Sequence, residues 1–154
     1  AGYEFKVALP FRNVYFTSII RDEIGRKLSK SLGNSPDPLE VIATYGADAL
    51  RFAMVYIAPV GIDIRYSNDK CELGRNFANK LWNACRFLYP QLEQAGALAA
   101  ELPMDKSLFA LEDKWILSRL QTTIKDATRM LEEYHFAELA GFLYRFVWDD
   151  VCSS

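Results

Sequence analysis

Histidine and cysteine are scarce in this chain. Among its 154 residues there is one histidine, His135, and there are three cysteines, Cys71, Cys85 and Cys152. Because the number of cysteines is odd and no Cys-x-x-Cys pair occurs, neither a disulfide framework nor a zinc site is indicated. We therefore predict no metal-binding residues and expect a protein of the reducing cytoplasm.

Long apolar runs and an excess of one charge are missing as well. The longest weakly polar stretch, residues 53–62, is interrupted by Pro59 and Gly61 and is too short to span a bilayer, so no membrane partner is expected. The first residues do not form a signal peptide. Lys plus Arg is 18 and Asp plus Glu is 20, which excludes a strongly basic nucleic-acid-binding protein but leaves room for a local basic face.

What the chain does contain is sufficient for a core. Hydrophobic residues make up 51% and charged residues 25%, as in folded proteins. The sequence has no initiator methionine, and its last residues read as a helix without a Gly or Pro stop. We expect an internal piece of a longer protein.

The first part of the chain predicts a strand, a loop and two helices. Residues 13–21 are rich in β-branched and aromatic side chains and predict a mostly buried strand. Residues 26–36 form a polar loop. Asp37 and Pro38 predict a helix start, and Gly46 is expected to interrupt this helix before it continues over residues 47–58. The side chains expected to face inward are Leu39, Ile42 and Ala43.

The rest of the chain predicts long helices. One begins at Ser67 and should end at Pro90, residues 93–107 read as a connector, and a third long helix covers residues 111–134. Helical spacing of apolar residues supports these helices. The stripes are Phe77, Leu81, Trp82, Cys85 and Leu88, then Leu117, Leu120, Ile124, Ala127, Leu131 and Tyr134, and in a last helix from Phe136 the residues Leu139, Ala140, Leu143 and Val147. The composition shifts near residue 60, our expected domain boundary.

Residues 25–34, Gly-Arg-Lys-Leu-Ser-Lys-Ser-Leu-Gly-Asn, are the most informative stretch. Lys27 and Lys30 flank Ser29, next to small residues, so two ammonium groups and several backbone N–H groups can be aimed at one polyanion. For an isolated Lys-x-Ser-Lys, a solvated basic turn is the more common interpretation. The flanking residues favour the polyanion-binding loop over the solvated turn.

Residues 27–31 resemble the KMSKS motif of class I aminoacyl-tRNA synthetases, with Leu28 in place of the usual Met. Residues 10–15, 32–34, 37–38 and 45–52 are similar to the valine, isoleucine and leucine group of that family. Residues 75–84 and 146–152 resemble its valyl branch, whereas residues 93–107 resemble nothing we recognise. One departure lies in residues 18–20, Ser-Ile-Ile, where relatives often have Gly-Leu-Ile.

The resemblance implies a mainly α chain. Residues 1–60 would be the end of a Rossmann-type α/β catalytic domain, consisting of a strand and the KMSKS loop. Residues 61–154 would be the first part of an anticodon-binding α-helical bundle.

The resemblance also implies partners and roles. The intact enzyme would activate valine with ATP, accompanied by Mg²⁺, and attach it to valine tRNA. Lys30 would hold the β- and γ-phosphates with help from Lys27 as the catalytic residues, and Ser29 and Ser31 would bind ATP or order the loop. The His-rich motif that completes such a site is not in this chain, so the chain alone should not form an aminoacyl-adenylate.

The resemblance further implies that a basic face on the helix after Ser67 contacts tRNA. The expected residues are Arg75, Asn79, Lys80, Trp82, Asn83 and Arg86, with Lys70, Arg119, Lys125 and Arg129 adding charge. The alternative is an ordinary solvated face with ion pairs such as Asp126 with Arg129.

Simpler roles are favoured for several conspicuous residues. Trp82 and Trp115 are expected to be core residues, and so are the cysteines. Asp48 with Arg51 should form a structural pair, and His135 should be a polar residue between helices.

Three other functions stay open. One is an isoleucyl or another class I synthetase, and another is a nucleotidyltransferase with a similar lysine loop. The third is a non-catalytic helical RNA-binding or interaction module, in which Lys27 and Lys30 would be dispensable.

Overall fold

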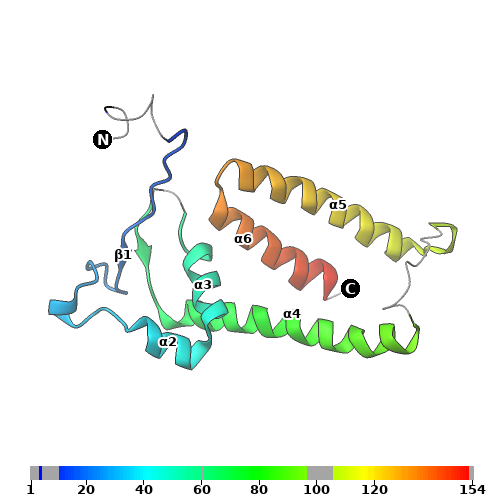
Figure 1. Cartoon of the computed structure of the whole chain (residues 1–154), viewed down its shortest axis with the longest axis horizontal. Helices are drawn as coiled ribbons and strands as arrows, with labels where there is room; N and C mark the ends of the chain where they lie inside the picture. The colour runs from blue at the N-terminus through cyan, green and yellow to red at the C-terminus, as the bar shows by residue number, and fades with distance from the viewer. Residues whose placement is uncertain (1–3, 5–10, 60, 97–105, 153–154) are drawn as a thin grey trace.

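The computed structural model describes residues 4, 11–59, 61–96 and 106–152. Most of the predicted connector, residues 97–105, therefore lies outside the described residues. The described chain is mainly helical with one small parallel sheet, as predicted, and the sheet lies with α2 and α3 at one end of the long helix α4 (Figure 1). The elements are β1 (Ile20–Arg21), η1 (Lys30–Leu32), α2 (Pro38–Tyr45), α3 (Ala47–Tyr56), β2 (Ile64–Arg65), α4 (Asn68–Gln94), η2 (Lys106–Leu108), α5 (Leu111–Glu132), α6 (Phe136–Arg145) and η3 (Phe146–Val151).

Strand β1 is much shorter than the sequence predicts. It pairs in parallel with β2, and the amide of Ile64 donates to the carbonyl of Ile19 over 2.9 Å. The prediction of a mostly buried strand over residues 13–21 was wrong, because the side chains of Val14 and Phe16 are 69% and 77% exposed. A strand needs a paired neighbour, and among the described residues β2 runs beside only its last two positions.

Helices α2 and α3 lie in the connection between the two strands. The carboxylate of Asp37 accepts a hydrogen bond from the amide of Leu39 over 2.9 Å, which confirms the predicted cap. Gly46, with φ 96°, separates the helices as predicted, because this backbone conformation favours glycine.

The inward face of α2 differs from the prediction. Leu39 is 73% exposed and Ile42 and Ala43 are exposed, whereas Val41 is 7% exposed. The reason is that α2 packs through the side of Val41 and Tyr45, which are one turn apart. The resulting core cluster joins Val41, Ala53, Tyr66 and Cys71, with Ile20, Tyr45, Leu50 and Met54 packed against it.

Helix α4 begins after Ser67 as predicted, but it continues through Pro90 instead of ending there. A proline removes one donor from the helical ladder and weakens the helix locally without having to terminate it. The predicted apolar stripe has the right spacing, yet only Phe77 is buried, and Leu81, Trp82 and Leu88 are exposed. The distal part of α4 extends past the end of α6 in Figure 1. Leu81 is 38% exposed, Trp82 70% and Leu88 52%, so these side chains are at most partly covered by described residues.

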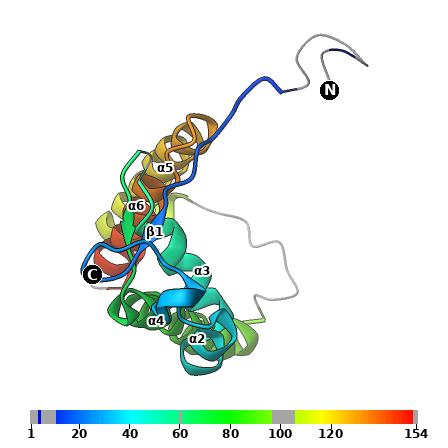
Figure 2. The ribbon, with the colours of Figure 1, turned by 90° about the vertical axis from the view of Figure 1, so that its left-hand side faces the viewer.

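Helices α5 and α6 pack side by side, joined by a short turn (Figures 1 and 2). Leu139 and Ala140 are buried as predicted, whereas Leu143 is 36% exposed. The α5 stripe is less covered than expected, with Ile124 at 50% and Leu131 at 51% exposure, because α6 covers only part of this face.

Helix α6 turns into the π-helix η3, which the sequence did not predict. Aromatic rings connect these elements: the ring centroids of Phe52 and Phe77 lie 4.9 Å apart, those of Phe77 and Tyr144 5.1 Å, and those of Tyr144 and Trp148 5.4 Å. Helices α3, α4 and α6 and the π-helix η3 are thus joined through one row of rings.

Within the described ranges, no helix combines the length and the apolar character that crossing a membrane requires.

Candidate functional site

The lysine loop, residues 25–34, follows β1 after a turn that begins at Asp22. The amide of Asp22 donates to the carbonyl of Arg26 over 2.8 Å, and the amide of Leu28 donates back to the carbonyl of Ile20 over 3.4 Å. A bridge pairs Arg21 with Lys27 in antiparallel fashion. The chain therefore reverses in a tight turn, which places the backbone of Lys27 beside that of Arg21.

The carboxylate of Asp22 holds this turn together. It accepts hydrogen bonds from the amide of Arg26 over 2.7 Å, from Nε of Arg26 over 2.8 Å and from Nδ2 of Asn34 over 3.0 Å. These donors, the Asn34 amide first and then Arg26, lower the pKa of Asp22 to about 2, because they stabilise its charged form more than burial destabilises it. Asp22 is thus a structural carboxylate that remains ionised at neutral pH.

The four residues predicted to bind ATP lie in this one loop. Lys30 begins the short helix η1, which ends at Leu32 and is followed by Gly33 with φ 64°. The hydroxyl oxygens of Ser29 and Ser31 lie 2.7 Å apart. Lys27 and Lys30 are exposed, and neither ammonium forms an ion pair within the described ranges. Two cations are therefore available to an incoming polyanion.

The sequence interpretation missed the importance of Asn34 and Asp22. From the sequence, Asn34 is named only as part of the stretch of residues 25–34, and Asp22 is not singled out. In the structure Oδ1 of Asn34 also accepts a hydrogen bond from the amide of Ser29 over 2.9 Å, and its Nδ2 lies 3.3 Å from the carbonyl oxygen of Lys27. The signal that could have identified it is the preference of Asn for side-chain hydrogen bonds to nearby backbone in turns.

A polar groove of about 530 Å³ lies beside the loop. Its lining includes the carboxylates of Asp22, Glu23, Asp37 and Glu40, so its charge disfavours a phosphate group. This acidic groove is therefore distinct from the two exposed lysines, which carry the positive charge of the loop. Across the described ranges, no cluster of three or more His, Cys, Asp or Glu side chains is arranged to hold a metal ion.

Five of the six predicted tRNA-contacting residues form one stripe on α4. Arg75, Asn79, Trp82, Asn83 and Arg86 are spaced at i, i+4, i+7, i+8 and i+11, which places them on one side of a helix. The structure thus brings them together as a continuous polar and aromatic surface.

Lys80, the sixth, is turned toward η3. Its Nζ lies 4.1 Å from the centroid of the Trp148 ring, a cation–π contact. Lys80 also lines a hollow of about 450 Å³ together with Asn79 and Asn83. It therefore borders the stripe while its charge is directed at an aromatic ring of the same chain.

The arginines differ in how much of their charge is already paired. Arg75 lies 3.6 Å from the carboxylate of Glu72 and 5.8 Å from the ring centroid of Tyr45. Arg86 forms no ion pair with a described residue. On α5, Arg119 pairs with Asp150 over 2.7 Å and Arg129 with Glu133 over 3.0 Å, so the simpler interpretation as paired surface residues describes these two.

Some of the simpler roles are confirmed and others are wrong. Asp48 and Arg51 form an exposed pair at 3.8 Å, and His135 lies at the start of α6, as expected. Trp82 and Trp115 are 70% and 44% exposed, so neither is a core residue.

The prediction that the cysteines are core residues is right for one of them and wrong for another. Cys71 is a core residue, whereas Cys85 is exposed. Both Trp82 and Cys85 line an open groove beside α4 and remain exposed there.

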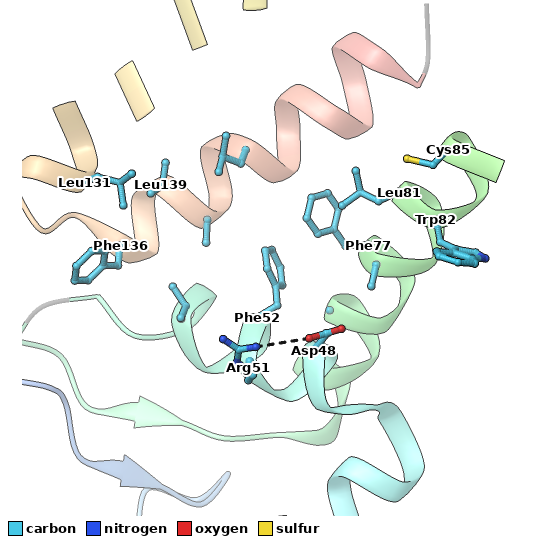
Figure 3. A pocket seen from close by; sticks show the side chains of 15 residues that line it. Asp48, Arg51, Phe52, Phe77, Leu81, Trp82, Cys85, Leu131, Phe136 and Leu139 are labelled. Carbon is cyan, nitrogen blue, oxygen red and sulfur yellow. Dashed lines mark ion pairs between the residues drawn. The ribbon is translucent and has the colours of Figure 1, made fainter. Parts of the chain in front are cut away.

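An apolar groove of about 770 Å³ lies between α3, α4 and α6 (Figure 3). Phe52, Phe77 and Leu139 line it, and Trp82 lies at its edge with its ring turned away from Phe77. It contains neither lysine of the loop, so the apolar groove and the lysine loop are separate features.

Two protein-family models match the chain. The family "tRNA synthetases class I (I, L, M and V)" matches residues 1–67, and the family "Anticodon-binding domain of tRNA ligase" matches residues 113–154. The first range includes the lysine loop, and the second includes most of α5 together with α6 and η3.

Curated relatives match almost the whole chain. The valine–tRNA ligase of Chlorobaculum tepidum is 47% identical over 99% of this chain, and that of Fusobacterium nucleatum is 49% identical over 97%. The valine–tRNA ligase of Bacillus cereus is 46% identical over 98%. The chain spans only 17–18% of the length of these relatives.

A solved structure shares the fold. The LeuRS of Agrobacterium radiobacter, determined as a ternary LeuRS-tRNA-LeuAMS complex, superposes with a TM-score of 0.76. The match covers 97% of this chain and 19% of that one, with 24% sequence identity. At this identity the likeness establishes the arrangement of strand, loop and helices.

Proposed function

Because this chain belongs to the class I tRNA synthetase family, in the branch of the valine–tRNA ligases, we propose that it supplies the ATP-phosphate-binding loop and part of the tRNA-binding surface of a valine–tRNA ligase. The observation that carries the proposal is the lysine loop, in which Lys27 and Lys30 are exposed and unpaired within the described residues. The amino acid is taken to be valine because the similar relatives are valine–tRNA ligases.

In the proposed reaction the loop stabilises charge. The carboxylate of valine attacks the α-phosphorus of ATP, an aminoacyl-adenylate forms and pyrophosphate departs. Negative charge then gathers on the β- and γ-phosphate oxygens, where Lys30, with help from Lys27, binds them. The lysines accelerate the step only to the extent that they bind the departing pyrophosphate more tightly than they bind ATP. Mg²⁺ bound to ATP supplies further positive charge.

The two serines order the loop in this proposal. The 2.7 Å contact between the hydroxyls of Ser29 and Ser31 fixes both side chains. The hydroxyl that accepts in this contact still has its own hydrogen to donate to a phosphate oxygen, since a hydroxyl both donates and accepts. Ser29 and Ser31 thus complete the ATP-binding set.

The stripe on α4 is the proposed tRNA contact. Arg75 and Arg86 would bind backbone phosphates, and Asn79 and Asn83 would donate to phosphate or sugar oxygens. Trp82, which is 70% exposed, offers a ring on which a base can stack. Lys80 adds positive charge at the border of this surface.

We place the boundary between the catalytic part and the anticodon-binding part near residue 60. Residues 1–60 then contain β1, the lysine loop, α2 and α3, and residues 61–154 contain the remaining elements. The valine–tRNA ligase in question would act in the cytoplasm.

Binding of ATP to this chain tests the loop. We expect Lys27→Ala and Lys30→Ala each to weaken binding of ATP, measured by calorimetry, by about tenfold, since each removes one charged contact. Lys114→Ala, an exposed lysine on α5, is the matched control and should bind normally. Equal affinity of all four chains would contradict the proposal and favour a non-catalytic helical module.

Binding of tRNA tests the stripe and the identity of the amino acid. Valine tRNA and isoleucine tRNA are titrated against the chain at low and moderate salt. A preference for valine tRNA supports the valyl assignment. Equal and steeply salt-dependent binding would show that these residues supply phosphate contacts only.

A further inference from the structure

The Asn34 side chain connects three parts of the lysine loop. Its Nδ2 donates to Oδ2 of Asp22 over 3.0 Å and lies 3.3 Å from the carbonyl oxygen of Lys27. Its Oδ1 accepts the hydrogen bond of the Ser29 amide over 2.9 Å. One amide group thus contacts the turn before the loop, the backbone at the first lysine and the backbone just before the second.

The lysines themselves have no comparable support. Within the described ranges neither Lys27 nor Lys30 forms an ion pair or a side-chain hydrogen bond that would hold its ammonium group. What places them is the backbone, which at Lys27 and Ser29 is held by Asn34, and at Lys30 by the single turn of η1. Without the Asn34 amide, the backbone on both sides of Leu28 loses its side-chain partner.

We propose that Asn34 is the positioning residue of the lysine loop, ordering its backbone before ATP arrives so that Lys27 and Lys30 are presented together. This inference rests on the proposed function of the loop in binding ATP. A loop that is already ordered loses less conformational entropy when it binds its ligand, and this raises its affinity.

The chemistry of the amide explains why asparagine suits this position. The carboxylate of Asp22 is ionised, so it can only accept hydrogen bonds, as it does twice from Arg26. A side chain that faces it at position 34 must therefore donate. The Ser29 amide requires an acceptor. A carboxamide provides both at once, whereas a carboxylate provides only acceptors and would face Asp22 with like charge.

The experiment compares amide exchange and ATP affinity in four chains. These are the unchanged chain, Asn34→Ala, Asn34→Asp and the control Ser35→Ala, whose exposed hydroxyl makes no hydrogen bond within the described ranges. In Asn34→Ala and in Asn34→Asp at pH 7, we expect the Ser29 amide to lose protection by about tenfold and ATP to bind about tenfold more weakly. Amides of α5 should keep their protection, which reports that the fold is intact.

Protonation separates positioning from a general loss of structure. Once its new carboxyl group is protonated, Asn34→Asp can again donate to Asp22, so the protection of its Ser29 amide should recover as the pH is lowered from 7 through about 4, near the ordinary pKa of an aspartate. Asn34→Ala should not recover. The comparison with Asn34→Ala accounts for the other charged groups near Asp22, namely Arg26, Glu23, Asp37 and Glu40.

The outcomes for the inference and for the proposed function differ. Unchanged Ser29 protection in Asn34→Ala would overturn the inference, and so would normal ATP affinity in that chain when Lys30→Ala binds weakly. If the unchanged chain and Lys30→Ala bind ATP equally, the proposed function of the loop fails. The ordering role of Asn34 is then decided by the exchange data alone.

Discussion

The charges of the lysine loop are divided between paired and unpaired residues. Arg26 forms an ion pair with Asp22 at 2.8 Å, so their opposite charges cancel locally. Lys27 and Lys30 remain, and they give the loop a positive charge although the whole chain carries a net charge of −2. The sign of the potential at a binding loop is therefore decided by the nearest residues and not by the composition.

The low pKa of Asp22 predicts how the loop responds to acid. A carboxyl group whose folded pKa is lowered stabilises the folded loop above its unfolded pKa, which is near 4, and this stabilisation is lost as the pH falls through about 2. We expect amide protection at Arg26 to decline between pH 4 and pH 2. In Asp22→Asn this decline should be absent, and an equal decline in both chains, measured by hydrogen exchange, would contradict the assignment.

The two arginines of the α4 stripe should contribute unequally to tRNA binding. The guanidinium group of Arg86 forms no ion pair within the described residues. That of Arg75 lies near the carboxylate of Glu72 and over the ring of Tyr45. Arg86→Ala should therefore weaken tRNA binding more than Arg75→Ala and should lower the slope of affinity against salt by about one unit. Filter binding over a salt series measures both, and Arg51→Ala, which removes an arginine on α3, serves as the control.

At the level of elements, the contact between α3 and α4 is set by Gly74. A Cβ atom at this position would lie 2.6 Å from the carbonyl oxygen of Ala49, closer than real Cβ atoms come to other atoms. The backbones of the two helices therefore meet directly, and the core cluster around Ala53 and Cys71 lies next to this crossing.

Gly74→Ala should destabilise the chain by about 1–3 kcal/mol, because the added methyl group forces the two helices apart. The matched control is Gly141→Ala on α6, where the nearest atoms lie at 3.7 Å and alanine favours the helix. Thermal and denaturant unfolding give both values. Equal effects of the two substitutions would show that the close approach at Ala49 does not matter.

Lys80 should act mainly as a link between α4 and η3. Its contact with Trp148 is expected to stabilise the chain by about 0.5–2 kcal/mol, so Lys80→Met should lose this amount while keeping the apolar stem. Lys80→Arg should retain most of it. Unfolding followed by tryptophan fluorescence measures the change. Full stability of Lys80→Met together with a loss of tRNA binding would instead make Lys80 a direct tRNA contact.

For the whole molecule, the sequence predicts which helices exist better than which faces they bury. The capping residue Asp37 and the break at Gly46 were read correctly because they act within a few neighbouring residues. Val41 was missed, and Trp82 was wrongly placed in the core, because burial depends on which partner element lies opposite.

The candidate site shows the same division. The two lysines were identified from their spacing, which is local information. The role of Asn34 depends on Asp22, twelve residues earlier, and on the turn that brings the two together. The π-helix η3 has no local signal that we recognised, and its contacts with Lys80 and Arg119 come from distant parts of the chain.

The chain by itself should not make an aminoacyl-adenylate. Its only histidine, His135, is exposed at the start of α6 and is not part of the lysine loop. Within the described ranges, the two lysines proposed to bind ATP have no second set of groups beside them to hold ATP and valine in reacting geometry, and such positioning accounts for much of the rate. ATP–pyrophosphate exchange with valine should stay at background, and exchange above background that Lys30→Ala abolishes would contradict this.

The close contact at Gly74 is a point about which α4 could tilt relative to α3. The helix has 27 residues, and the part beyond Gly74 reaches about 30 Å further. Since the backbones of the two helices touch at Gly74, α4 cannot slide along α3 without pressing a side chain against the backbone of Ala49. A tilt of about 6° there would displace the far end by about 3 Å, the scale of a hydrogen bond. A small tilt at the contact with Ala49 would thus be magnified along the stripe that is proposed to meet tRNA.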